Sequence, residues 1–166
     1  MDTWLAVASK RDTRGYSTRP VPDEVERRIL DAGRLAGSAM NRQPWRFLVV
    51  ESAEVRERLA GSVYAPDNVR GAQLVVAIVG RGSMDIGRCA QNMMLAAWND
   101  GVASCPNGFP DVDAAAAVLG LEGEDRPATV LTFGYPGKER EPQSHPPEEW
   151  SAGANRKPVD ELVQTI

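Results

Sequence analysis

The sequence predicts one domain in which helices and strands are mixed. Its 166 residues are enough for a substantial core and suit a single domain. The run from Leu74 to Val79 is continuously apolar and β-branched, which is typical of a strand covered on both faces. From Asp85 to Asp100 the pattern is helical and leaves little polar surface. The core is therefore expected to contain both kinds of element, and no repeat or internal boundary divides the chain.

The N-terminal residues predict a first helix. Thr3 can cap it, and Trp4, Val7 and Ala8 then fall on one apolar face. The helix is expected to run into a group of basic residues and to stop near Gly15.

Caps, breakers and apolar spacing define the remaining elements. Proline and two acids at 22–24 begin a second helix, whose apolar stripe reaches residue 36. The others are a strand at 45–50, a helix from Ser52 through Leu59, a strand at 102–104 after Gly101 ends the long helix, a helix at 112–119 and a strand at 128–134. Residues 136–166 are expected to form an extended C-terminal tail, in which Val159, Leu162 and Val163 can dock on another surface.

Charge and composition exclude several classes of protein. A net charge of -4 argues against a nucleic-acid binder, whose affinity comes mostly from phosphate neutralisation. No apolar run approaches the length of a membrane span, and no basic region precedes the first apolar residues as in a signal peptide. Cys89 and Cys105 show no paired-motif spacing, so we expect reduced thiols in a cytoplasmic protein.

The chain offers few reactive side chains of its own. The single histidine, His145, lies in the polar tail, where it is expected to be solvated rather than to act as an oriented base. One histidine, two separated cysteines and scattered acids give no metal-site pattern. No phosphate-binding loop ending in Lys-Ser or Lys-Thr occurs. If the protein is an enzyme, a bound cofactor must carry the chemistry.

A glycine pair at Gly80 and Gly82 follows a strand and opens a helix, as in a dinucleotide-binding fingerprint. The third glycine of that fingerprint is replaced by Asp85, whose carboxylate would compete with a pyrophosphate for the helix N-terminus. We therefore interpret this stretch as a helix cap.

Four stretches, in order, resemble the FMN-dependent nitroreductase family. KRDTRGY resembles the family's R-R-S-x-R-x-(F/Y), and SAMNRQPW resembles its P-S-x-x-N-x-Q-P-W segment before a strand. QNMMLAA, followed by CPNGF, resembles A-Q-N-L-x-L-A-A and C-x-x-G-F, while FGYP and RKPVDELV fit the late G-Y-P and R-K-P-L-E-E-V. The first two stretches are residues 10–16 and 38–45, the third combines 91–97 with 105–109, and the fourth combines 133–136 with 156–163. Together they span nearly the whole chain.

The resemblance implies an α+β fold, with a mixed central sheet flanked by helices, and an intertwined homodimer with FMN at the subunit interface. It assigns the flavin phosphate to Lys10 and Arg11, closed by the late pair Arg156 and Lys157. The remaining implied cofactor-binding residues are Asp12 for the ribityl hydroxyls, Arg14 for the N1/O2 edge, backbone near N5 at Pro106, Asn107 and Gly108, and, from the partner, Ser38, Asn41 and Gln43. No side chain is identified as a catalytic acid, and no metal is expected.

Two residues depart from the family pattern. Lys10 replaces the usual arginine and offers a point charge in place of a bidentate fork. Asp12 replaces the usual serine and places a carboxylate near the expected phosphate. Little sequence lies between Leu59 and Leu74, so any lid over the flavin is expected to be small.

The resemblance implies an FMN-dependent NAD(P)H oxidoreductase. Hydride would pass from NADH or NADPH to flavin N5 and then, in a ping-pong cycle, to a nitroaromatic, quinone or activated alkene. Two alternatives stay open: a flavin-binding protein of the same fold without turnover, and a specialised dehydrogenase or deazaflavin-linked member of the family.

Overall fold

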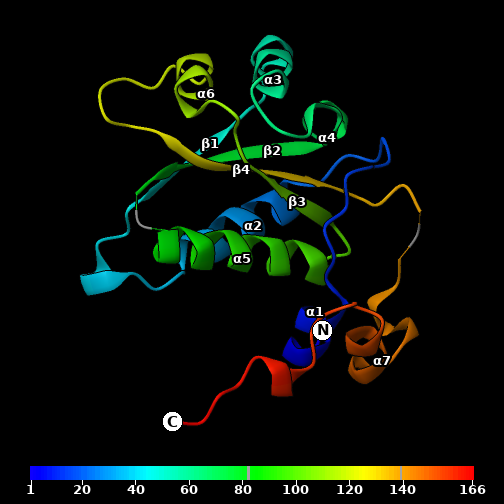
Figure 1. Ribbon diagram of the computed structural model, residues 1–166. Coiled ribbons are helices and arrows are strands. Elements are labelled where there is room, and N and C mark those ends of the chain that lie inside the picture. The colour runs from blue at the N-terminus through cyan, green and yellow to red at the C-terminus, as the bar shows by residue number, and fades with distance from the viewer. Residues whose placement is uncertain (82, 139) are drawn as a thin grey trace.

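A single four-stranded sheet forms the centre of the molecule (Figure 1). The computed structural model describes residues 1–81, 83–138 and 140–166. The strands, in the spatial order β1-β2-β4-β3, are β1 (Trp45–Val49), β2 (Leu74–Gly80), β4 (Pro127–Gly134) and β3 (Ala103–Asn107). All three pairings between neighbouring strands are antiparallel. The α+β class is confirmed, while the parallel part of the expected mixed sheet is an isolated bridge between Asp12 and Ser104.

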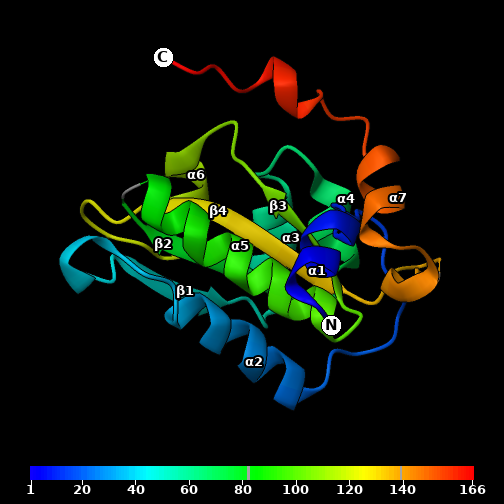
Figure 2. The same ribbon diagram turned by 90° about the horizontal axis from the view of Figure 1, so that it is seen from below.

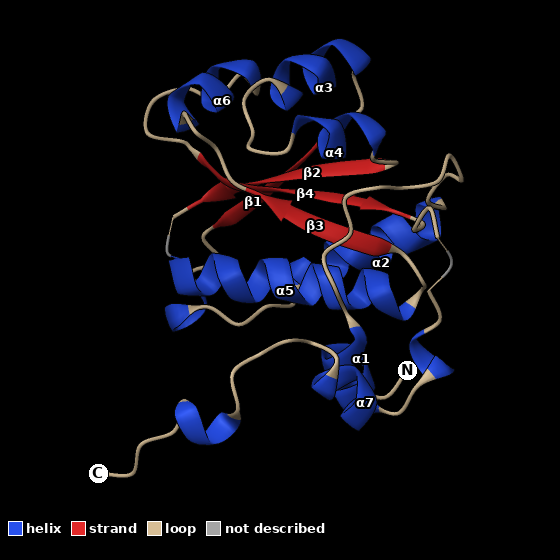
Figure 3. Ribbon diagram, turned by 45° about the vertical axis from the view of Figure 1, so that its right-hand side comes forward, coloured by secondary structure: helices blue, strands red, loops and turns tan. Residues whose placement is uncertain are grey.

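Helices cover both faces of the sheet (Figures 1 and 3). The α-helices are α1 (Thr3–Ser9), α2 (Asp23–Arg34), α3 (Ala53–Ala60), α4 (Pro66–Gly71), α5 (Ser83–Asn99), α6 (Val112–Val118) and α7 (Pro147–Ala152). Short 3-10 turns are η1 (Ala39–Asn41), η2 (Pro142–Ser144) and η3 (Val159–Glu161). Helices α2 and α5 lie on one face, and α3, α4 and α6 lie on the other. Helices α4 and α7 were not predicted from the sequence.

Strand β2 is buried on both faces, as its continuous apolar run predicts. Leu74, Val76 and Ile78 join the core under α2 and α5. Val75 and Ala77 point the other way, into the core under α3 and α4. Each of these five side chains is at most 3% exposed. Alternate side chains of this one central strand therefore pack into the hydrophobic layers on the two faces of the sheet.

Helix α1 is shorter than predicted and begins with a different cap. Asp2, not Thr3, caps it by accepting hydrogen bonds from the first backbone amides. The helix ends at Ser9, because Lys10 is extended (ψ 129°). Of the predicted apolar face, Ala8 is buried, whereas Trp4 and Val7 are 55% and 47% exposed.

The C-terminal residues from 136 onward leave the sheet and pass beside α1 (Figure 2). Helix α7 packs against α1, and the Trp150 indole N–H donates to the Pro142 carbonyl at 2.8 Å. Beyond α7 the chain extends away from the body of the molecule. The apolar side chains Val159, Leu162 and Val163 are between 64% and 70% exposed, so the expected docking does not occur on this chain itself.

Strand β3 extends three residues beyond the prediction, to Asn107, even though it contains Pro106. A proline cannot donate a ladder hydrogen bond, but β3 is an edge strand, where such a residue is tolerated.

Candidate functional site

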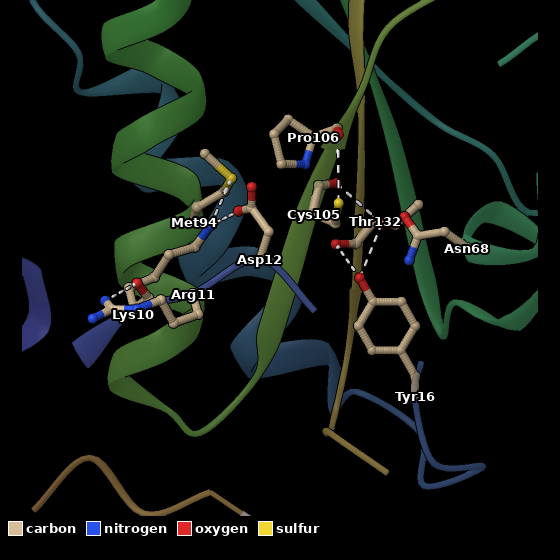
Figure 4. A network of polar contacts seen from close by, with 9 residues as sticks. All are labelled: Lys10, Arg11, Asp12, Tyr16, Asn68, Met94, Cys105, Pro106 and Thr132. Carbon is tan, nitrogen blue, oxygen red and sulfur yellow. Dashed lines mark hydrogen bonds and ion pairs between the residues drawn. The ribbon is translucent and has the colours of Figure 1, made fainter. Parts of the chain in front are cut away.

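Residues 10–17, which we name the N-terminal segment, lie extended beside the edge of the sheet (Figure 4). The Thr13 amide donates to the Ser104 carbonyl of β3 at 3.0 Å. At the other end, the Ser17 amide donates to the Tyr135 carbonyl at 2.8 Å. These backbone bonds explain why the first helix does not continue to Gly15 as predicted.

Lys10 and Asp12 form an ion pair on this segment. The Lys10 ammonium donates to an Asp12 carboxylate oxygen at 2.5 Å and also lies 3.4 Å from the sulfur of Met94 on α5 (Figure 4). The lysine side chain is only 9% exposed, whereas the aspartate side chain is 53% exposed. The cation predicted to meet the flavin phosphate therefore already has an anionic partner.

The Arg11 guanidinium connects α1 with α7. It donates to the carbonyl oxygens of Ala8 at 2.6 Å, Lys10 at 2.8 Å and Trp150 at 2.7 Å. Charged donors make hydrogen bonds of about 1.5–3 kcal/mol each. Much of the donor capacity of Arg11 is thus used to fix the backbone around the N-terminal segment.

Arg11 is repelled by the charges of two further guanidinium groups, those of Arg140 and Arg156. Burial lowers the pKa of Arg11, and the positive charges of Arg156 and Arg140 lower it further. Arg140 also lines a pocket together with Thr13 and Gly15 of the N-terminal segment. We name Arg11, Arg140 and Arg156 the arginine cluster. A phosphate would relieve the repulsion and accept several N–H bonds, so the cluster suits a phosphorylated ligand. The exposed residue Lys157 directly follows Arg156 in the sequence.

Arg14 lies near Cys105 of β3. Burial raises the pKa of the Cys105 thiol, and the negative charge of Asp12 raises it further. Arg14 acts in the opposite direction, through its charge and a hydrogen bond. The exposed Arg14 guanidinium therefore stands at the β3 edge, close to the ion pair of the N-terminal segment.

The predicted backbone stretch at the end of β3 divides into exposed and buried parts. Pro106 and Gly108 are exposed, and the Gly108 carbonyl accepts a hydrogen bond from the Tyr64 amide at 3.2 Å. Asn107 is 3% exposed, and its amide group donates to Asn68 at 2.8 Å. The Asn107 side chain thus serves the core, while the neighbouring backbone stays at the surface.

The loop that holds Ser38, Asn41 and Gln43 has an unusual backbone. Met40, Asn41 and Gln43 all have positive φ angles, between 49° and 54°. Left-handed backbone is uncommon for residues other than glycine and often marks a functional loop. The Gln43 amide donates to the Ser38 hydroxyl at 2.9 Å, and the Gln43 side chain donates to the Asn41 carbonyl at 3.2 Å. The loop is therefore held in a defined, strained shape.

Within one chain, this loop and the N-terminal segment contact α5 at two positions nine residues apart. Asp85, in the first turn of α5, accepts a hydrogen bond from the Ala39 amide at 3.2 Å. Met94, which contacts Lys10, follows nine residues later, or roughly 14 Å along the helix axis. The carboxylate of Asp85 thus holds the loop in addition to lying at the start of its own helix. The two groups of predicted residues do not meet within a protomer.

A buried polar network beneath the N-terminal segment was not predicted from the sequence (Figure 4). The Tyr16 hydroxyl lies 3.0 Å from the Thr132 hydroxyl, which donates to the Asn68 side-chain oxygen at 2.6 Å. That oxygen also accepts the bond from Asn107. The available signal was polar residues at single positions of otherwise apolar strands. The network anchors the C-terminal end of the N-terminal segment to β4.

Titration of Tyr16 is expected to weaken the fold at high pH. Burial raises the pKa of Tyr16 to about 12, against opposing hydrogen bonds from Thr132 and Asn68. A raised folded-state pKa gives stability that is complete below pH 10 and lost as the pH rises toward 12. Between pH 9 and 12, the native chain should therefore lose about 2 kcal/mol more unfolding free energy than Tyr16→Phe. Urea unfolding at stepped pH measures this difference, and parallel curves for the two proteins would contradict it.

Comparisons with known proteins agree with this architecture. A model described as the nitroreductase family matches residues 7–81 and 80–135. A protein of Methanothermobacter thermautotrophicus, provisionally named NADH dehydrogenase/NAD(P)H nitroreductase, is 27% identical over 151 residues. That match covers 83% of this chain and 79% of the relative.

Two solved structures share the fold. A provisionally named nitroreductase of Desulfovibrio desulfuricans, in complex with FMN, superposes with a TM-score of 0.82 at 25% identity, covering 100% of this chain and 98% of the other. The NADPH:FMN oxidoreductase of Vibrio harveyi, in complex with NAD+, gives a TM-score of 0.82 at 21% identity, covering 96% and 75%. In the described part of this chain, no helix combines the length and apolarity needed to cross a bilayer.

The resemblance found in the four sequence stretches is thus confirmed by an independent family model that covers most of the chain. The antiparallel sheet between two helical layers agrees with the solved structures. This chain belongs to the nitroreductase family.

Proposed function

We propose that the protein is an FMN-dependent oxidoreductase that oxidises NADH or NADPH and reduces electron-poor small molecules, such as nitroaromatics, quinones or activated alkenes. The match of the nitroreductase family model to residues 7–81 and 80–135 is the observation that carries this proposal. Guanidinium groups beside the N-terminal segment, Arg11 on it and Arg140 in a pocket with Thr13 and Gly15, favour a phosphate-bearing ligand. The FMN complex of the Desulfovibrio desulfuricans relative supports FMN as that ligand.

The described residues fit a flavin mononucleotide. Lys10 and the arginine cluster, with Lys157 beside it, would hold the phosphate, and Arg14 would place a positive charge against the electron-rich edge of the ring. Surface backbone at Pro106 and Gly108 leaves room for a flat ring beside β3. When bound, the flavin supplies the hydride chemistry that this chain's own side chains lack.

The loop residues Ser38, Asn41 and Gln43 would complete the site from a second copy of the chain. Within one protomer they lie roughly 14 Å along α5 from Lys10, which supports a site completed by another protomer. The exposed side chains Trp4 and Met84 supply apolar surface for such a contact. We therefore propose a homodimer with its flavin sites at the interface.

The C-terminal tail is suited to reach across that interface. A groove of about 880 Å³ lies between α2 and the edge strand β1, lined by Trp45, Phe47 and three arginines of α2. Residues 159–163 combine exposed apolar side chains with two acids and extend away from their own body. Tail and groove both carry apolar side chains, and the three arginines of the groove outnumber its two acids, Glu24 and Asp31, which supports an intertwined arrangement. Buried free thiols at Cys89 and Cys105 are consistent with the cytoplasmic location that we propose.

Anaerobic spectroscopy of the purified protein tests the proposed function. The protein, as isolated or after addition of FMN, should show visible flavin absorption that NADH or NADPH bleaches and that an added nitroaromatic or quinone restores. Retained flavin that neither nicotinamide bleaches would indicate the alternative, a flavin-binding protein without turnover. Protein that binds no FMN at all would contradict the proposal. Ultrafiltration of the sample separates bound from free flavin and serves as the control.

A further inference from the structure

The ion pair between Lys10 and Asp12 is asymmetric. The lysine side chain is nearly buried, packed against Met94 of α5, whereas about half of the aspartate side chain faces solvent. The lysine ammonium therefore has little freedom to leave, and the carboxylate can turn away into water. Any anion that approaches the ammonium has to compete with a carboxylate that the chain itself supplies.

Neighbouring basic groups are already engaged in hydrogen bonds, so the ion pair of Lys10 and Asp12 matters more for binding an anion. Arg11 donates to three carbonyl oxygens, which leaves fewer of its N–H groups for a ligand. Asp12 bridges Ser104, the neighbour of Cys105 on β3, so its carboxylate lies at the same strand edge as Arg14. The positive charge offered to a phosphate at this edge is therefore smaller than the run of basic residues in the sequence indicates.

We propose that Asp12 is an internal counter-anion of Lys10 that lowers the affinity of this site for phosphorylated flavin relative to flavin without a phosphate. This inference rests on the proposed flavin site and deepens it. In the free protein the carboxylate neutralises the ammonium. With FMN bound, the carboxylate lies near a second anion and repels it. Riboflavin carries no phosphate and avoids this repulsion, so Asp12 sets how strongly the site prefers FMN over riboflavin.

The backbone around Asp12 does not depend on its side chain. Asp12 bridges Ser104 through main-chain groups, and the neighbouring Thr13 amide donates to the Ser104 carbonyl. The substitution Asp12→Asn keeps the size and removes the charge at a half-exposed position, so the segment keeps its course. A purely structural role of the pair would predict a change in stability with no change in the preference between flavins.

Equilibrium binding of FMN and riboflavin, followed by quenching of flavin fluorescence, tests the proposal. Asp12→Asn should bind FMN about fivefold more tightly, while riboflavin affinity changes by less than about twofold. Because the added attraction is electrostatic, the gain for FMN should shrink toward nothing at about 1 M salt, where the screening length is short. The matched control is Glu54→Gln, an exposed carboxylate on α3 at the opposite face of the sheet, which changes net charge equally and should leave both affinities unaltered.

The outcomes separate this inference from the proposed function. The measured quantity is the ratio of the riboflavin dissociation constant to the FMN dissociation constant. If FMN binds and Asp12→Asn leaves this ratio within about twofold of the native value, the proposed role of Asp12 is overturned while the proposed function stands. Equal tightening of both flavins, or an equal gain in Glu54→Gln, would overturn it as well. Failure of the native chain and of every variant to bind either flavin would overturn the proposed function together with this inference.

Discussion

Replacing Gly80 with alanine is expected to lower the free energy of unfolding by about 3 kcal/mol or more. Gly80 has a φ of 153° at the end of β2, a backbone conformation that residues with a Cβ rarely adopt. An added Cβ would stand about 1.9 Å from the Pro44 carbonyl oxygen, which is a backbone atom that cannot rotate away. The β1–β2 pairing at Trp45 would have to open to admit it.

Urea denaturation measures this loss, and Gly87→Ala supplies a matched control. Gly87 lies in α5, and apart from the backbone of that helix nothing lies within 4 Å of the position that an added methyl group would take. Alanine there should raise stability by about 0.5–1 kcal/mol through helix propensity. The two substitutions add the same methyl group with opposite expected signs. A loss below about 1 kcal/mol for Gly80→Ala would show that the strand ends can separate at little cost, against this account.

The close contact at Gly80 also determines the position of one loop of the candidate site. The carbonyl that meets Gly80 belongs to Pro44, which follows the loop of Ser38 and Gln43. A small residue at the end of β2 therefore sets where that loop leaves the sheet. From the sequence, this glycine is interpreted only as part of a weak dinucleotide motif, because the contact joins residues 36 positions apart and leaves no local pattern.

The buried elements could be predicted because their environment is uniform along the chain. Strand β2 is apolar at every position since both of its faces are covered, and α5 shows a helical period since one side faces the core. Helix α1 shows the limit of the same reasoning. Trp4 and Val7 give a pattern that equally describes a core face and an exposed interface, and in the protomer both are exposed.

The residues of the candidate site could be predicted from the family motifs. The hydrogen-bond and ion-pair partners of those residues could not, because the motifs do not specify them. In an extended segment, side chains two positions apart lie on the same side, which is how Lys10 meets Asp12. These residues were predicted to lie at the end of a helix, where that spacing does not bring side chains together, so the pair was not foreseen. The Tyr16 network was likewise inaccessible, because Asn68 and Thr132 lie 64 positions apart and meet only in the folded protein.

Mixed dimers built from two different defective chains are expected to regain flavin sites that neither parent has. Arg14→Ala removes a charge from the N-terminal segment, and Asn41→Gly with Gln43→Gly removes two loop side chains. Glycine adopts the positive φ angles of 54° and 49° found at these loop positions, so the second change deletes side chains without adding strain. Each variant alone should bind FMN at least about tenfold more weakly, because every site in its homodimer lacks one set of contacts.

Refolding the two variants together in equal amounts should restore about a quarter of the native sites. Half of the dimers are then mixed, and each mixed dimer holds one site with an intact N-terminal segment and an intact loop from different chains. These sites are counted by titration with FMN. The FMN concentration is kept well below the dissociation constants of the two variants, so that only restored sites bind it. NAD(P)H oxidation in the same samples should recover in proportion.

The control pair is Arg14→Ala with Lys10→Met. Both changes lie on the N-terminal segment, so every site of their mixed dimer keeps a defective segment and should show no recovery. Native mass spectrometry establishes that mixed dimers have formed in each sample. If mixed dimers of the first pair form without regaining FMN sites, the segment and the loop do not share a site across two chains. Within one protomer, about 14 Å of α5 separates the N-terminal segment from the loop. Recovery of FMN sites in the first pair, without recovery in the control pair, therefore means that the segment of one protomer and the loop of the other contact the same ligand.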